Sequence, residues 1–422
     1  MLLPKFVRIK QKFHAPALHD AAKELLNQLH AVQLADRIAP GMRIAITAGS
    51  RGIAHISEMV AALVRKLKEW GAEPFIVPAM GSHGGATAEG QAEVLRSLRI
   101  TEEICGAPVL SSMDVVQIGE TKGGVPVFID KNASQADGII LLGRIKPHTD
   151  FKSPHGIESG LMKMAAIGLG KHKQAMLLHR YGVEGLRDIM PEVAGVILAR
   201  APILCGIAIV ENAFDETALI EALPPERIRE REPQLLKLAM EWMPKLPVEQ
   251  LDVLLVDEIG KNYSGTGMDT NIIGRLRIAG TPEPSSPSIR YIVVCDISGE
   301  SHGNATGIGL ADVTTRRLFE KIDLQATYEN VLTSTFLHRG MLPIIAPNAR
   351  KALEYALRAS WGVEPGKAKI IRIPNTLQIQ YLDVSEAVYE EIAGLDTIET
   401  VREAEELPWD ADGYLPKFWN KR

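Results

Sequence analysis

Cysteine is scarce in this chain of 422 residues, and its three cysteines, Cys105, Cys205 and Cys295, lie far apart. Without a Cys-x-x-Cys pair, the sequence excludes a local zinc knuckle and a framework of disulfide bonds. So few cysteines at such spacing fit a reducing compartment, and we expect a cytoplasmic protein.

Long apolar runs and an excess of positive charge are also missing. No stretch approaches 18 consecutive apolar residues, and the opening MLLPKFVRIKQKF holds no signal-peptide core, so no membrane partner is expected. Acidic residues outnumber lysine and arginine by 52 to 47, and no basic stripe is present, which argues against nucleic acid as a partner. Hydrophobic residues make up 46% of the chain, enough for sizeable buried cores.

Short apolar runs alternate with amphipathic stretches along the chain. Continuous apolar strands between helices indicate parallel sheets covered on both faces. We predict an α/β fold of two domains with mainly parallel, Rossmann-like three-layer sheets and a cleft between them. The predicted domains are residues 1–247 and 248–399, and the aromatic tail 400–422 is predicted to pack back on the first. The predicted strands and helices include strands 43–47, 74–78, 138–142, 251–256, 290–295 and 369–373, and helices 55–70, 89–98, 233–242, 314–322 and 349–360.

The segment 145–181 holds the densest set of reactive side chains. Imidazole is the commonest metal ligand and the usual acid or base near neutral pH. A lysine among apolar residues loses its charge easily and can form covalent adducts. The segment contains four histidines and one such lysine: His148, His155, His172, His179 and Lys163.

Ligands of parallel sheets bind beyond the carboxyl ends of strands, and two predicted strands end in glycine-rich loops. Arg51 lies in AGSRG after the first, where its guanidinium could grip a carboxylate or simply face solvent. His83 lies in GSHGGAT after the second. The backbone of Gly84 and Gly85 could hold a phosphate, or the two glycines could serve only a tight turn.

Taken in order, these motifs resemble the lactate racemase family, whose members use a nickel-pincer nucleotide cofactor. That family has an arginine after its first strand, a loop histidine, a Pro-His pair, a lysine that binds the cofactor covalently, and a nickel-ligating histidine. The last two are 16 positions apart here (179 − 163), as in the family. The matching positions are Arg51, His83, His148, Lys163 and His179.

The resemblance implies a divergent member. Its cofactor, a pyridinium bis-thio mononucleotide with nickel, would be tethered to Lys163, ligated by His179, and bound at Gly84 and Gly85. Ala48 and Gly52 replace an aspartate and a proline of the family pattern. The interval from His148 to Lys163 is longer than usual.

The longer interval leaves two histidines, His148 and His155, as candidates for one acid/base role. In the second domain Asp269 and Asn271 match the family, but its glutamine is absent, and Arg275 or Arg277 takes the place of a lysine. We therefore expect a 2-hydroxy acid other than lactate, contacted by Arg51, Asn271 and Arg275.

The activity implied is racemisation or epimerisation by reversible hydride transfer. Arg51 would hold the substrate carboxylate, and His83 or His148 would take the hydroxyl proton. Hydride would pass to the cofactor and return to the other face of Cα, while the opposite histidine supplied the proton. Such a protein needs cofactor-assembly enzymes as partners; the sequence carries no signal for an oligomeric state.

Two other functional hypotheses remain open. A metal-dependent hydrolase or lyase would bind zinc through His83, His148, His155 and a carboxylate, and would not need Lys163. A nucleotide- or phosphate-binding protein would use the glycine-rich loops, bind without turnover, and be indifferent to the loss of His179.

Overall fold

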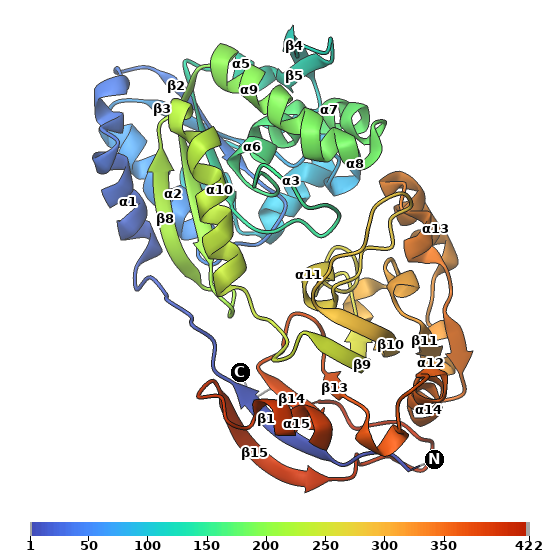
Figure 1. Cartoon of the computed structure of the whole chain (residues 1–422). Helices are drawn as coiled ribbons and strands as arrows, with labels where there is room; N and C mark the ends of the chain where they lie inside the picture. Colours follow the sequence, from blue (N-terminus) through green and yellow to red (C-terminus); the bar gives the residue numbers. More distant parts are fainter. Residues whose placement is uncertain (1, 419–422) are drawn as a thin grey trace. The chain divides into compact units, whose positions relative to one another are not determined.

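The chain divides into two units, and the division does not follow chain order. The computed structural model describes residues 2–418. His14–Met243 forms one unit, called here the N-terminal unit; Met1–Phe13 and Pro244–Arg422 form the other, called the C-terminal unit (Figure 1). The chain passes from the N-terminal unit into the C-terminal unit at Pro244, close to the predicted domain boundary after residue 247.

The N-terminal unit is built on a five-stranded sheet in the order β3-β2-β6-β7-β8. Neighbouring strands are parallel except for β8, which runs antiparallel to β7. A separate hairpin, β4-β5, accompanies the sheet. Its strands and helices are α1 (Ala21–Ala31), β2 (Arg43–Ala48), α2 (Ile56–Glu69), β3 (Glu73–Pro78), α3 (Ala88–Ser97), α4 (Glu102–Cys105), β4 (Val115–Glu120), β5 (Pro126–Asp130), α5 (Lys131–Ser134), β6 (Gly138–Arg144), α6 (Leu161–Lys163), α7 (Leu169–His179), α8 (Gly182–Glu184), α9 (Met190–Arg200), β7 (Ile203–Glu211), β8 (Thr217–Leu223) and α10 (Pro225–Trp242).

Both faces of this sheet are buried, so the predicted three-layer arrangement is confirmed. Successive side chains of a strand point to opposite faces. Ile44 and Ile46 of β2 pack with the apolar side of α2. Ala45, between them, faces a second core formed with α9 and α10. All three side chains are fully buried.

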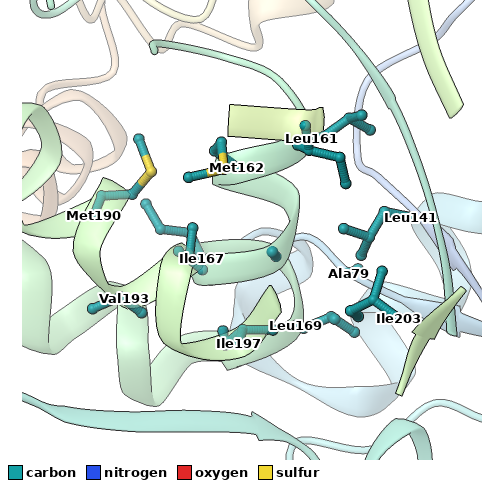
Figure 2. Packing of buried hydrophobic residues seen from close by; sticks show 14 of the residues in the cluster. Ala79, Leu141, Leu161, Met162, Ile167, Leu169, Met190, Val193, Ile197 and Ile203 are labelled. Atoms are coloured by element: carbon teal, nitrogen blue, oxygen red, sulfur yellow. The ribbon is translucent and has the colours of Figure 1, made fainter. Parts of the chain in front are cut away.

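One long helical run lies in that second core. It starts as α6, continues through a π-helical turn at Met164–Gly168, and ends as α7. Lys171 has a φ of 56° and kinks the run. Figure 2 shows Leu161 on the side of the run toward Leu141 of β6, and Ile167 on the side toward Met190 of α9. The packing fixes the buried apolar side of this run.

The C-terminal unit contains an eight-stranded sheet in the order β12-β11-β10-β9-β13-β14-β1-β15. Strands from β12 to β13 are parallel, whereas β14, β1 and β15 are joined by antiparallel pairings. Its elements are β1 (Phe6–Gln11), β9 (Gln250–Ile259), α11 (Thr270–Ile273), β10 (Ser288–Ile297), β11 (Val313–Thr315), α12 (Arg316–Phe319), α13 (Leu324–Ser334), β12 (Ile344–Ala346), α14 (Ala349–Ala359), β13 (Ile370–Ile373), β14 (Tyr381–Ser385), α15 (Glu386–Ile392) and β15 (Ile398–Glu405).

The tail packs on the C-terminal unit, so its predicted placement on the first domain is wrong. Strand β15 pairs with β1, and Tyr414 is buried in the core of this unit. The Tyr414 hydroxyl donates to the carbonyl of Pro347 (3.3 Å), and its ring stacks under Arg317. Trp419, another aromatic of the tail, lies outside the described residues.

A second correction concerns the predicted helix 314–322. Its first residues form strand β11, and only the short α12 follows. Val313, Thr314 and Thr315 are β-branched and fit a buried strand better than a helix. Within residues 2–418, no helix is long and apolar enough to cross a membrane.

Candidate active site

Lys163 is a partly buried amine in apolar surroundings. It ends the first turn of the helical run, between Met162 and Met164. Removal from water lowers its pKa to about 8; Asp150 and Glu158 oppose this shift, and Arg51 reinforces it. At pH 7 roughly a tenth of such an amine is unprotonated, compared with about one in three thousand for an ordinary lysine. Lys163 is therefore suited to act as a nucleophile.

The imidazole of His148 lies directly against this amine. Its Nε2 is 2.6 Å from Nζ of Lys163. The backbone N–H of Asp150 donates to the other ring nitrogen, Nδ1 (3.1 Å). Because Nδ1 accepts, the neutral ring carries its proton on Nε2, which can donate to Nζ when the amine is unprotonated. Only an unprotonated amine can accept that hydrogen bond, so the arrangement favours neutral Lys163.

A buried carboxylate shapes the loop that carries His148. Glu158, 3% exposed, accepts from the backbone N–H groups of His148 (2.7 Å) and Ser153 (3.1 Å). A bridge between Lys146 and Ser159 closes the base of the loop. His155 lies at its exposed outer part. The structure thus brings His148, and not His155, against Lys163.

Charged groups around the amine come from other strand ends. Arg51 follows β2 and is solvent-accessible, yet surrounding protein displaces enough of its water to lower its pKa. Arg144, at the end of β6, lowers the pKa of Arg51 further, and Asp150 raises it. Arg144 itself is paired with Glu211. Arg51 is the more accessible of the two guanidinium groups and the better candidate to hold an anionic substrate.

The loop with His83 packs on the same helical run. A Cβ at Gly81 would lie 2.8 Å from Ile167, and one at Gly168 would lie 2.8 Å from the Ala79 carbonyl oxygen. His83 is exposed, and its carbonyl accepts from the buried Gln91 side chain (3.2 Å). The loop is therefore held tightly while its histidine side chain remains accessible.

The two glycines after His83 differ from one another. Gly84 has a φ of 66°, and a Cβ there would lie 2.6 Å from the backbone of Gly90, so a tight turn explains this glycine. Gly85 has a φ of 65° with open space beside it. The side chain of Thr87 caps α3 by accepting from the N–H of Gly90. Of the two predicted phosphate contacts, only Gly85 offers an open backbone.

His179 ends the helical run that starts beside Lys163. Burial lowers its pKa, the charge of Lys163 lowers it further, and Asp150 opposes them. The neutral imidazole that results is the form that binds metals. Its role as a nickel ligand remains a prediction.

The predicted substrate contacts of the second domain lie in the C-terminal unit. Asn271 donates through its side-chain amide to Asp269 (2.8 Å) in the cap of α11. Arg275 pairs with Asp312 (2.6 Å) and donates to the carbonyls of Leu310, Ile289 and Arg290. Arg275 thus has a structural role that its sequence context did not reveal.

A metal site made of several protein ligands has no support in the geometry. Among residues 2–418, no group of three or more histidine, cysteine, aspartate or glutamate side chains is placed to hold a metal. A single protein ligand such as His179 does not require such a group.

Sequence reasoning missed the buried groups that support the site. Lys171, fully buried, bonds to Asp130 (3.1 Å), to Gln91 (3.3 Å) and to the carbonyl of Pro78. Gln91 in turn holds the His83 loop. Glu158 was also missed, although a carboxylate next to the apolar run 160–170 is a signal in itself.

Comparison with known proteins finds a family model that matches part of the chain. Residues 6–185 match the model of the lactate racemase N-terminal domain. Over these residues the chain is similar to the lactate racemase family. No curated protein matches it.

A solved structure shares the fold of this lactate racemase-like chain. The lactate racemase apoprotein from Thermoanaerobacterium thermosaccharolyticum superimposes with a TM-score of 0.52 and 12% sequence identity. The match covers 89% of this chain and 99% of that one. At this identity the likeness shows a shared fold and extends across both units.

Proposed function

We propose that this lactate racemase-like protein is a racemase or epimerase of a 2-hydroxy acid. The observation that carries the proposal is the contact between Nε2 of His148 and Nζ of Lys163 in the part of the chain that matches the family. A desolvated amine with a lowered pKa beside an imidazole suits covalent attachment of a cofactor better than a surface role.

The residues present fit a nickel-pincer nucleotide. Lys163 would tether it, and His179, which burial keeps neutral, would ligate the nickel. Gly85 offers an open backbone for a phosphate. When bound, the cofactor would supply a hydride acceptor for the Cα of the substrate. We keep the cytoplasm as the expected compartment, since all three cysteines are free thiols.

The chain's own residues would bind the substrate and move its protons. Arg51 would hold the substrate carboxylate through its guanidinium. A covalent bond at Nζ of Lys163 would remove the lone pair to which His148 donates. Nε2 of His148 would then be available to the substrate hydroxyl, with His83 as the second acid or base.

The test is an isotope experiment on full-length protein from a host that assembles the cofactor. Single enantiomers of several 2-hydroxy acids, each with deuterium at Cα, are incubated in ordinary water. We expect inversion of at least one, with deuterium retained at Cα, because hydride leaves and returns without exchanging with solvent. The measurement is chiral chromatography with mass spectrometry.

Two variants accompany it. Lys163→Met should abolish inversion, whereas Lys237→Met, an exposed lysine of α10, should leave it intact. Complete loss of deuterium would contradict the hydride route and indicate proton abstraction. Hydrolysis or elimination that survives Lys163→Met would favour the metal-dependent alternative, and nucleotide binding without any turnover would favour a binding protein.

A further inference from the structure

A buried carboxyl group from a distant helix reaches the start of the Lys163 helix. Glu232 of α10 is 1% exposed. It lies on the apolar stripe of that helix, in register with other buried side chains at helical spacing. These are Ile228, Leu235, Leu236 and Ala239.

Glu232 supplies the cap that α6 lacks. Its Oε2 accepts from the backbone N–H of Met162 (2.9 Å), 70 positions away in sequence. The N-cap residue Gly160 provides no side-chain cap of its own. The first N–H groups of a helix need acceptors, and a carboxylate there is favoured by the helix dipole. Glu232 therefore fixes the turn that ends in Lys163.

Two glycines make this approach possible. A Cβ at Gly160 would lie 2.5 Å from Cδ of Glu232, closer than real atoms come. A Cβ at Gly156 would lie 2.7 Å from Cβ of Pro233, the next residue of α10. Two consecutive residues of α10, Glu232 and Pro233, thus lie close to the chain before and after Glu158. The Glu158 carboxylate accepts from the backbone N–H of His148.

Burial of the Glu232 carboxyl group costs free energy, and packing of the core alone does not explain why this residue is there. Burial raises its pKa to about 7, while hydrogen bonds from the backbone of Met162 and Leu161 lower it. Within the described chain, its Oε1 has no hydrogen-bond partner. An apolar side chain of similar volume would fill the core without the free-energy cost of burying a carboxyl group. What the carboxyl group adds is the fixed position of the α6 backbone.

We propose that Glu232 is the positioning residue of Lys163: by capping α6 it holds Nζ against Nε2 of His148. The inference rests on the proposed role of Lys163 as the attachment point of the cofactor. It adds a residue that touches neither substrate nor cofactor.

The test uses full-length protein without cofactor, so it does not depend on turnover. A small amine-reactive reagent is applied over a range of pH, and labelling of the Lys163 peptide is followed by mass spectrometry. The labelling curve gives the pKa of Lys163, and exchange of the Leu161 and Met162 amides is measured in parallel. The charged groups that also act on this amine stay unchanged in all variants; they are Arg51, His148, Asp150, Glu158 and His179.

Glu232→Ala should speed exchange of the two amides at least tenfold and move the Lys163 labelling curve toward that of an ordinary lysine. Glu232→Gln keeps an acceptor and should restore most of both properties, which a loss of packing alone would not predict. Glu241→Gln, an exposed change on the same helix, should have no effect.

A double variant tests the contact itself. Gly160→Ala should displace the carboxyl group and resemble Glu232→Ala, and the added methyl should be tolerated better when Glu232 is already alanine. The proposal is overturned if Glu232→Ala leaves the labelling curve and the exchange rates unchanged. Failure of the racemase assay with intact Lys163 labelling would instead count against the proposed function.

Discussion

Lys163 combines reactivity with a cost to the folded state. Its lowered pKa means that the native protein holds the proton less tightly than the unfolded chain does. The penalty is present below about pH 8 and is relieved as the pH rises toward 10.5, where the unfolded lysine also loses its proton. A residue retained at such a cost is expected to have a function.

Replacing Lys163 by methionine should therefore stabilise the protein at pH 7. We expect a gain of about 1 to 3 kcal/mol in the free energy of unfolding, less the lost contact with His148. The gain should shrink at pH 10, because wild-type Lys163 is then neutral in the folded state. Urea unfolding at pH 7 and at pH 10 measures the gain in the free energy of unfolding at each pH, with Lys237→Met as the exposed control. An equal gain at both pH values would show that charge burial is not the cause.

For single residues, the sequence allowed the candidate site residues to be named but did not reveal the hydrogen bonds between them. Lys163 and His148 could be named because an unusual lysine and a Pro-His pair appear in a recognisable order. The proton on Nε2 could not be predicted, since it depends on one backbone amide, that of Asp150. Arg275 was predicted to contact substrate because it takes the place of a lysine of the family; its pairing with Asp312 could not be seen in the sequence.

The elements followed from periodicity wherever one face is apolar. Helix α2 was predicted within a residue at each end because its buried side chains recur at helical spacing. The helical run 161–179 was only partly predicted. Its π-helical turn and its kink at Lys171 depend on contacts with β3, α3 and β5 that no local pattern reveals. Glu232 was hidden for a related reason, since REREPQ looks like a solvated charged stretch.

The buried pair of Lys171 and Asp130 should be essential to how these elements join. Lys171→Met leaves the carboxylate of Asp130 buried without its cation, and we expect a loss of about 3 to 5 kcal/mol in unfolding free energy. Adding Asp130→Asn, which removes that charge and keeps the cap on Ala133, should recover a large part. Urea unfolding provides the measurement, and Lys122→Met is the exposed control. If the double variant is as unstable as the single one, the pair is not the cause.

For the whole molecule, the sequence predicted the α/β fold class. It missed that the first residues belong to the last domain, because β1 is an ordinary alternating strand with no mark of its partners. Its neighbours, β14 and β15, follow it by more than 350 positions, as the pairing of Phe6 with Ser385 shows.

Removing residues 1–13 should disrupt the C-terminal unit and spare the other. The deletion takes out β1, which lies between β14 and β15 in the sheet. We expect residues 244–418 to become sensitive to limited proteolysis, while 14–243 stays protected and Lys163 keeps its labelling curve. Mass spectrometry of the fragments gives the measurement. Equal protection of both units after the deletion would contradict the prediction.

The position of β1 also bears on how the protein forms in the cell. The N-terminal unit is continuous in sequence and can fold while the rest is still being translated. Strand β1, made before that unit, must wait until β14 and β15 have left the ribosome. At about 5 to 20 residues per second, that delay is on the order of 20 to 80 seconds. During this delay β1 remains unpaired while the N-terminal unit that follows it is already folded. This segment is therefore a natural site for chaperones to bind.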